Sequence, residues 1–249
     1  GKSALTANTS GASNVAVGEA AMDANTTGGS NVAVGRDALG ANTTGSFNQA
    51  FGRNALLTNT TGQYNNAFGN DALKVNTASN NTAVGHAALV ANTTGAANTS
   101  VGYSSLYQNT TGAANGAFGY QTLFSNTTGA DNVAVGTNAL YNNLTASNNT
   151  AVGRESLFAN TTGAANTSVG YQSLTANTTG ASNTVVGKQA AKANTTGANN
   201  VAIGDSAAFA ATTSTGNVII GQAAVQTGVF TGFNNVVIGK LAGEDLTSA

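Results

Sequence analysis

The side chains that could serve catalysis or bind a metal are few and far apart in this chain. His86 is the one histidine, and the 249 residues include no cysteine. A single histidine without a neighbouring base or nucleophile fits no acid–base or covalent mechanism, so we expect it to be a surface residue. Asp37, Asp71 and Glu155 occur at equivalent places of non-adjacent repeats, so we expect no paired carboxylates. These observations predict a protein that is not an enzyme and uses no metal or cofactor.

Short motifs of other kinds of site are incomplete or have a simpler explanation. Gly1, Lys2 and Ser3 match the end of a phosphate-binding loop but lack its upstream glycine. The G-G-x-G-x-D calcium repeat is absent. N-x-[ST] triplets accept glycans in a eukaryotic secretory pathway, but here they recur within an N-T-T-G element. We interpret them as turn residues; examples are Asn25, Asn42, Asn59, Asn92 and Asn109.

The composition is typical of neither a nucleic-acid-binding nor a membrane protein. Only 7% of residues are charged and the formal net charge is −1, against roughly 25% charged residues in an ordinary domain. No apolar stretch approaches the ~20 residues needed to cross a bilayer. We therefore expect no nucleic-acid partner and no membrane insertion of this segment.

A seventeen-residue repeat organises almost the whole chain. Aligned on the unit N-x-A-V-G-x-x-A-L-x-x-N-T-T-G-x-x, copies start fourteen times between Asn14 and Asn235, and only two of the spacings depart from the period, each by a single position. Positions 1 to 17 denote equivalent residues of these copies below. Gly1–Ser13 corresponds to positions 5 to 17, so we expect the chain to be part of a longer protein.

The repeat favours a β-solenoid over pairs of helices, because glycine in a helix interior costs ~1 kcal/mol and would recur in every copy. We predict an all-β fold, a parallel β-solenoid or β-roll of about 17 residues per coil with two short strands in each coil. Strand alternation leads us to expect positions 4 and 9 inside the coil and the small residue of position 3 outside. The predicted core is Val17, Val34, Phe51, Phe68, Val84, Val101, Phe118, Val135, Val152 and Val169, with Leu39, Leu56, Leu73, Leu89 and Leu106.

Glycine at position 5 predicts a positive φ angle or a close approach of two backbones. These turn glycines include Gly18, Gly35, Gly52, Gly69, Gly85, Gly102 and Gly119. In the N-T-T-G turn, we expect Asn to tolerate the left-handed region and Gly to allow φ above zero. Stacked Asn and Thr side chains are expected to form hydrogen-bonded ladders.

Each coil has few large apolar side chains for the residues that it must order. We therefore expect the small residues of position 3 to pack against another chain, and a homotrimer would bury that face.

Several segments resemble the repeats of trimeric autotransporter adhesin heads. They are N-V-A-V-G-R-D-A-L (Asn31–Leu39), N-T-A-V-G-H-A-A-L (Asn81–Leu89) and N-V-A-I-G-D-S-A-A (Asn200–Ala208). The resemblance covers nearly the whole chain and implies a left-handed β-roll of three chains on a bacterial surface, although the family repeat is shorter than the one found here. The full repeat is also similar to phage tail-fibre repeats that precede an endosialidase-type intramolecular chaperone, a domain that this sequence does not contain.

Aromatic residues occupy position 10 in four consecutive repeats, with two tyrosines nearby in sequence. One interpretation is packing between chains or within a groove. The other is a binding strip for a host-surface protein or a glycan, since exposed aromatic residues serve recognition. The residues are Tyr103, Tyr107, Tyr120, Phe124, Tyr141 and Phe158.

The repeat becomes less regular toward the end of the chain. We divide the sequence into regular repeats over 1–206 and degenerate repeats over 207–249, which form a cap or junction. Phe230 and Phe233 are the residues expected to cover the last coil.

Together these features predict a non-catalytic structural fibre segment on an extracellular bacterial or virion surface. It would act as an adhesin head or shaft that presents a repetitive polar face for attachment, with other copies of itself as partners. The alternatives are a phage tail-fibre shaft, a self-assembling extracellular filament and an ice-binding solenoid, the last because N-T-T-G supplies two threonines per repeat.

Overall fold

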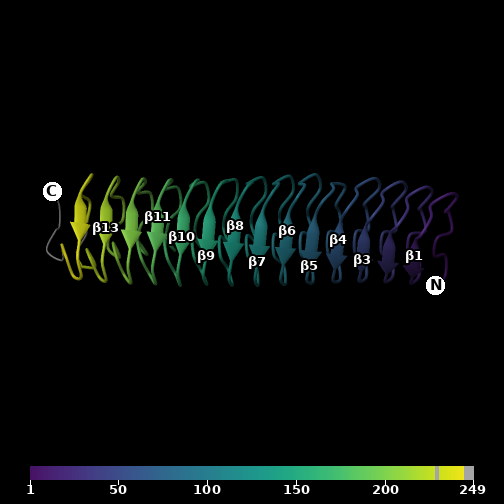
Figure 1. The fold of residues 1–249 in the computed structure, drawn as a ribbon, viewed down its shortest axis with the longest axis horizontal. Helices are drawn as coiled ribbons and strands as arrows, with labels where there is room; N and C mark the ends of the chain where they lie inside the picture. The colour runs from purple at the N-terminus through teal and green to yellow at the C-terminus, as the bar shows by residue number, and fades with distance from the viewer. Residues whose placement is uncertain (228–229, 244–249) are drawn as a thin grey trace. The chain divides into compact units, whose positions relative to one another are not determined.

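The computed structural model describes residues 1–227 and 230–243, which fall into two compact units, Gly1–Thr128 and Gly129–Ala249. The described residues contain no helix, and every strand is three residues long (Figure 1). The N-terminal unit holds β1 (Val15–Val17), β2 (Val32–Val34), β3 (Gln49–Phe51), β4 (Asn66–Phe68), β5 (Thr82–Val84), β6 (Thr99–Val101) and β7 (Gly116–Phe118). The C-terminal unit holds β8 (Val133–Val135), β9 (Thr150–Val152), β10 (Thr167–Val169), β11 (Thr184–Val186), β12 (Val201–Ile203), β13 (Val218–Ile220) and β14 (Val236–Ile238).

Within each unit the strands pair in parallel and in sequence order, so each strand begins the next coil of a solenoid. Equivalent positions pair throughout: Ala33 is opposite Ala50, and Ala202 is opposite Ile219. The register survives the one shortened spacing, where Asn66 pairs with Thr82. The predicted parallel β-solenoid, in which one repeat makes one coil, is confirmed.

The prediction of two strands in each coil is wrong, since the described coils contain one. The second half of the coil is turned because non-glycine residues at positions 7 and 9 adopt left-handed φ angles, such as 58° at Asp37 and 50° at Leu39. A third left-handed residue, Phe47 with φ of 60°, occupies position 17. Left-handed geometry costs an ordinary residue ~1–2 kcal/mol, so packing of the coils must offset it.

Glycine is required at two places in the coil for different reasons. Gly35, at position 5, has φ of 139°, and a Cβ there would lie 2.5 Å from the carbonyl oxygen of Gly52 in the next coil, which confirms the prediction for this position. Gly45, at position 15, is not among the residues with positive φ, so our expectation for the N-T-T-G glycine is wrong. A Cβ on Gly45 would instead lie 2.5 Å from the carbonyl oxygen of Gly62.

Two columns of buried asparagine run through the coils. At position 12, Asn92 donates from Nδ2 to Oδ1 of Asn76 (2.7 Å) in the coil before and to the Gly95 carbonyl (2.8 Å) in its own turn. At position 1, the backbone N–H of Asn98 donates to Oδ1 of Asn81 (2.9 Å). The predicted ladders are confirmed, but these asparagines hold the turn with their side chains and do not have positive φ.

The interior of the coil is formed by positions 3, 8 and 9 and by the two asparagine columns. The predicted core leucines Leu39, Leu56, Leu73, Leu89 and Leu106 are fully buried. Position 3 is buried in every strand from β2 to β14. The expectation that these small residues pack against another chain is therefore wrong, because their own coil covers them.

The predicted orientation of position 4 is also wrong. None of its residues is buried: Val17 is 56% and Phe118 is 42% exposed. Strand alternation has two possible phases, and the coil is too thin to hold a large residue at position 4 opposite leucine at position 9. The residues that point outward are Val17, Val34, Phe51, Phe68, Val84, Val101, Phe118, Val135, Val152 and Val169.

Positions 3 and 9 exchange volume, which supports their facing each other in the interior. Where position 9 shrinks from Leu174 to Ala191, position 3 grows from Ser168 to Val185. The coil that begins at Asn200 has alanine at both, Ala202 and Ala208, and these residues line a cavity of about 10 Å³. Such a space is no larger than one water molecule.

The less regular end of the chain continues the same architecture as far as it is described. Strands β13 and β14 extend the ladder of the C-terminal unit beyond residue 207. Phe230 is buried and forms a parallel bridge with Ala211, whereas Phe233 is 61% exposed. Phe230 is thus placed to cover the interior and Phe233 is not. The cap or junction over 207–249 stays a prediction, and 228–229 and 244–249 lie outside the described residues.

Candidate functional site

Repeat positions 2 and 4 are the first and last residues of each strand, and their side chains point away from the interior. We call the surface that they form the outward strand face, and none of its residues is charged. Position 4 is valine, isoleucine or phenylalanine in all fourteen strands. Position 2 is mostly valine or threonine, and Val15 and Val133 are among the exposed apolar residues. Since position 3 between them is buried, both columns point away from the interior. Sequence reasoning missed this face because it assigned position 4 to the core.

Aromatic side chains of successive coils stack on one another outside the coil. In the N-terminal unit, Tyr103 stacks on both His86 (5.3 Å between ring centroids) and Tyr120 (5.5 Å). Tyr107 stacks on Phe124 at 5.0 Å. In the C-terminal unit, Tyr141 and Phe158 stack at 5.3 Å. The six predicted binding residues thus divide between two columns, at positions 6 and 10.

These stacks present little free ring face to a ligand. Tyr103 and Tyr120 are about half exposed, but their planes differ by only 12° and each covers a face of the other. Tyr107 and Phe124 are inclined by 5°. The hydroxyl groups of the tyrosines remain as polar contacts, so the arrangement suits hydrogen bonding better than stacking of a sugar ring. The binding role of these residues stays a prediction.

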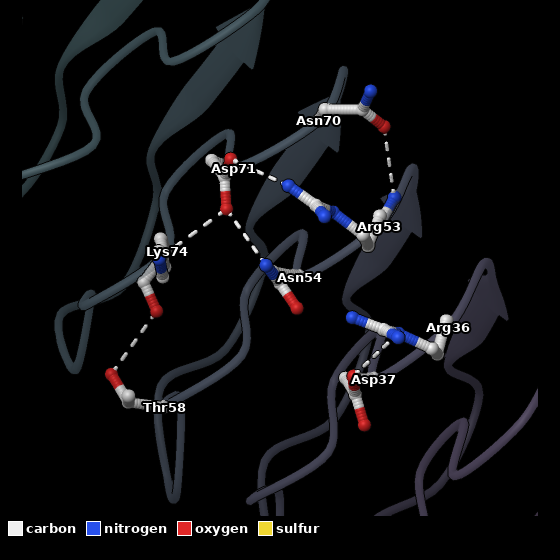
Figure 2. A network of polar contacts seen from close by, with 8 residues as sticks. All are labelled: Arg36, Asp37, Arg53, Asn54, Thr58, Asn70, Asp71 and Lys74. Carbon is white, nitrogen blue, oxygen red and sulfur yellow. Dashed lines mark hydrogen bonds and ion pairs between the residues drawn. The ribbon is translucent and has the colours of Figure 1, made fainter.

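Several charged residues form local ion pairs on the surface of the coils. Figure 2 shows Asp71 at the centre of the largest group, with Asn54 Nδ2 at 2.8 Å, Lys74 Nζ at 3.4 Å and Arg53 at 3.7 Å. Burial alone would raise the pKa of Asp71. The hydrogen bond from Asn54 and the charges of Lys74 and Arg53 outweigh burial and hold that pKa below its usual value.

The Asp71 group is expected to stabilise the coil at neutral pH. Because the pKa of Asp71 is lowered in the folded state, its contribution is present above the unfolded pKa of ~3.9 and is lost as pH falls through the folded pKa. Asp71→Asn should therefore lower the free energy of unfolding by about 1 kcal/mol at pH 7. Urea melts at pH 7 and pH 2.5 measure this difference. Asp37→Asn, whose carboxylate pairs with Arg36 alone at a more exposed site, is the matched control; an Asp71→Asn effect that is the same at both pH values would contradict the assignment.

A second polar group lies in the C-terminal unit. Gln172 donates from Nε2 to Glu155 at 2.7 Å, and Arg154 pairs with the same carboxylate at 3.0 Å. The hydrogen bond from Gln172 lowers the pKa of Glu155, with Arg154 adding to the effect against the opposing influence of burial. Glu155 thus links two coils. Among the described residues, no second carboxylate shares an ion pair or a hydrogen bond with it.

The remaining site types receive no support from the described part of the chain. Residues 1–227 and 230–243 contain no group of three or more histidine, cysteine, aspartate or glutamate side chains that could hold a metal ion. His86 is exposed, as expected, and its ring contacts Tyr103. Over the same residues, no helix has the length and apolar character needed to cross a membrane.

Comparison with known protein families, characterised proteins and solved structures finds no match to this chain. The outward strand face is therefore the candidate functional site on its geometry alone.

Proposed function

We propose that this chain is a non-catalytic structural fibre segment whose copies pack side by side through the outward strand face. The observation that carries the proposal is that this uncharged, largely apolar face recurs in every coil and is left uncovered by the chain itself. The resemblance of the repeat to trimeric adhesin heads supports three copies, displayed on an extracellular bacterial or virion surface. A tail-fibre shaft or an extracellular filament would use the same segment.

The size of the face supports an interaction role. A strand of three residues is roughly 10 Å long, and neighbouring strands are ~4.8 Å apart. The seven strands of each unit therefore give a flat footprint of roughly 300 Å². The largest apolar patch on a monomeric protein is itself about 300–600 Å² and is often functional, so a face of this size is consistent with an interaction role. Burial of the exposed valine and phenylalanine side chains would add the apolar surface that a thin coil lacks.

A second copy of the chain is the partner whose surface matches this face best. A partner must present an uncharged surface, because a charge buried opposite the strands would be left unpaired. It must also repeat at the spacing of the coils to contact all of them equally. Another copy meets both conditions without further assumption.

Attachment to a host-surface protein or glycan is the second part of the proposal. The stacked tyrosines at positions 6 and 10 carry hydroxyl groups, and Tyr103, Tyr107 and Tyr120 are exposed. These tyrosines are not part of the outward strand face, so they would stay accessible to a target after copies assemble through that face.

Ice binding is a second candidate, but it is supported by threonines of the strands and not by the N-T-T-G threonines that the sequence suggested. The first threonine of N-T-T-G donates its hydroxyl to the next coil, as Thr93 does to the Thr110 carbonyl at 3.0 Å. Three consecutive strands instead carry outward threonine at position 2 beside valine at position 4: Thr150, Thr167 and Thr184. Thermal hysteresis in a cooled solution of a monomeric chain would favour this candidate.

Charge placed on the outward strand face tests the proposal. The chain has a mass of 24.3 kDa, and we expect light scattering after size exclusion to give three times that value. The double variant Val84→Lys/Val135→Lys should be monomeric with an unchanged far-ultraviolet circular dichroism spectrum. His86→Lys/Thr137→Lys adds two charges in the same coils at exposed position 6 and should keep the wild-type mass. A monomeric wild type, or a strand-face variant that still assembles, would overturn the proposal.

A further inference from the structure

One of the stacked ring pairs outside the coil consists of two tyrosines. Tyr103 and Tyr120 lie at position 6 of successive coils, with 5.5 Å between their ring centroids and 12° between their planes. Both belong to the N-terminal unit, and about half of each side chain is exposed. The ring of His86, from the coil before, covers the other face of Tyr103. Tyr120 is therefore the tyrosine that Tyr103 contacts.

The other four tyrosines of the chain contact groups of a different kind. Three of them stack on a phenylalanine of a neighbouring coil, and the fourth lies beneath the guanidinium group of an arginine. These pairs are Tyr64–Phe47, Tyr107–Phe124, Tyr141–Phe158 and Tyr171–Arg154. The chain has six tyrosines, and the ring contacts of the described residues bring two of them together at one place.

The Tyr103–Tyr120 pair is exposed in a chain that has few other side chains open to oxidation. Cysteine and tryptophan are absent, and the single methionine, Met22, is fully buried. Tyrosine is the next most readily oxidised side chain, because its phenol can give up a hydrogen atom and form a long-lived radical. An oxidant that reaches this surface would therefore act on tyrosine.

The two rings are free to approach each other from their stacked arrangement. A bond between them requires both rings to tilt until an ortho carbon of one meets an ortho carbon of the other. Neither hydroxyl group takes part in a hydrogen bond among the described residues, and half of each side chain is exposed. Rotation about χ1 and χ2 therefore breaks no polar contact of the coil.

We propose that Tyr103 and Tyr120 are a site of oxidative coupling, at which a dityrosine bond joins two coils of one chain. The oxidant is hydrogen peroxide, used by a haem peroxidase. Each phenol loses one hydrogen atom, a bond forms between one Cε atom of each ring, and the hydrogen on each of these carbons then returns to the ring oxygen. The two electrons and two protons removed convert the peroxide to two molecules of water. The inference does not rest on the proposed function, because both tyrosines belong to the same chain.

The bond would serve this cysteine-free chain as a disulfide serves other extracellular proteins. Tyr103 and Tyr120 are one repeat apart, so coupling closes a loop the length of one coil. A cross-link over a loop of this length restricts the unfolded chain and lowers the equilibrium constant for unfolding by roughly a hundredfold. The expected consequence is a covalent staple between two neighbouring coils.

Treatment of the folded chain with hydrogen peroxide and a haem peroxidase tests the site. Products are separated by mass in urea, so that single chains are measured apart from chains linked to each other. We expect single chains to show dityrosine fluorescence and to be lighter by two hydrogen atoms. Tyr103→Phe and Tyr120→Phe should each lower that fluorescence at least tenfold. The matched control is Tyr107→Phe, which removes a tyrosine from the same coil as Tyr103 and should leave the fluorescence unchanged.

Urea melts of the treated single chains measure the staple. Coupled wild type should unfold at higher urea than the untreated chain, by the hundredfold change in equilibrium constant given above, while treated Tyr103→Phe should melt like its untreated form. A coupled chain that melts like the untreated one would overturn the stapling role.

The possible results separate this inference from the proposed function. If Tyr103→Phe keeps the fluorescence of single chains, or if the wild type forms dityrosine only between chains, the assigned pair is wrong, whatever the mass of the assembly. If the wild type is monomeric by light scattering but couples within single chains, the proposed assembly fails and the coupling site stands.

Discussion

Asn92→Asp is expected to lower the free energy of unfolding by about 3–5 kcal/mol at pH 7, the range for a buried charge left without a partner. Asn92 is fully buried and donates from Nδ2 to Oδ1 of Asn76 and to the Gly95 carbonyl. Aspartate has the same shape but no donor when ionised, so its oxygen would face two other oxygens. The variant also deprives Asn76 of the donor in the following coil.

The pH dependence of this variant follows from the sign of the expected pKa change. Burial beside two carbonyl oxygens would raise the pKa of the new carboxyl group above its unfolded value of ~3.9. The destabilisation should therefore be small in acid and grow as pH rises through that value. Urea melts between pH 3 and pH 8 measure it. Asn70→Asp is the control, because Asn70 is exposed and its Oδ1 only accepts, from the Arg53 backbone N–H at 3.1 Å. Equal effects for both variants would contradict the role of the ladder.

Passage through a eukaryotic secretory pathway is expected to prevent folding of this chain. Glycans are attached at N-x-[ST] triplets to the side-chain nitrogen of asparagine. In the N-T-T-G turns that nitrogen is buried in the folded coil, as in Asn109, which donates from Nδ2 to Oδ1 of Asn92 and to the Gly112 carbonyl. The triplets that begin at Asn80 and Asn148 have exposed asparagines. A glycan cannot occupy this interior, so a chain modified before folding could not close the turn.

Secretion from insect or mammalian cells, with and without an inhibitor of glycan transfer, tests this expectation. The untreated product should be glycosylated and lack the β-sheet circular dichroism spectrum that chain from bacterial cytosol shows. A variant with alanine as the last residue of every such triplet should fold with or without the inhibitor; at Asn92 the change falls on exposed Thr94. A product that is glycosylated at Asn92 or Asn109 and has the bacterial melting temperature would contradict the buried ladder.

Much of the fold is predictable from the sequence because one repeat makes one coil. The period of the repeat, the glycine at position 5 and the buried leucines Leu39 and Leu56 follow from the pattern alone. Stacking of equivalent residues also makes the asparagine ladders predictable. These features depend on the period and on residue type, which a single sequence displays fully.

Alternation did not predict which side chains of a strand face the interior, because in a three-residue strand either the middle residue or the two outer residues can point inward. Between two successive repeats, position 9 changes from Leu174 to Ala191 while position 3 changes from Ser168 to Val185. This compensation in volume was visible in the sequence and would have placed positions 3 and 9 face to face. Left-handed φ angles at residues such as Leu39 and Phe47 left no such signal. Leucine and phenylalanine rarely adopt them, so tertiary packing imposes this geometry against local preference.

The position 12 ladder also has a direction along the chain. Asn42 donates to Asn25 and Asn194 donates to Asn177 in the coil before it, so these amide dipoles add head to tail. Asn76 is an exception, because its Nδ2 donates to the Ala78 carbonyl and Oδ1 of Asn59 in the preceding coil has no partner among the described residues. Each uninterrupted row of amides therefore has a net dipole, with its positive end toward its first coil and its negative end toward its last. In the C-terminal unit the row stops at Asn194, where Ala211 takes the next place. Oδ1 of Asn194, like Oδ1 of Asn59 in the N-terminal unit, has no partner among the described residues. Because aligned hydrogen bonds polarise one another, coils in the middle of a row are held more strongly than those at its ends, and unfolding should begin where the row is interrupted.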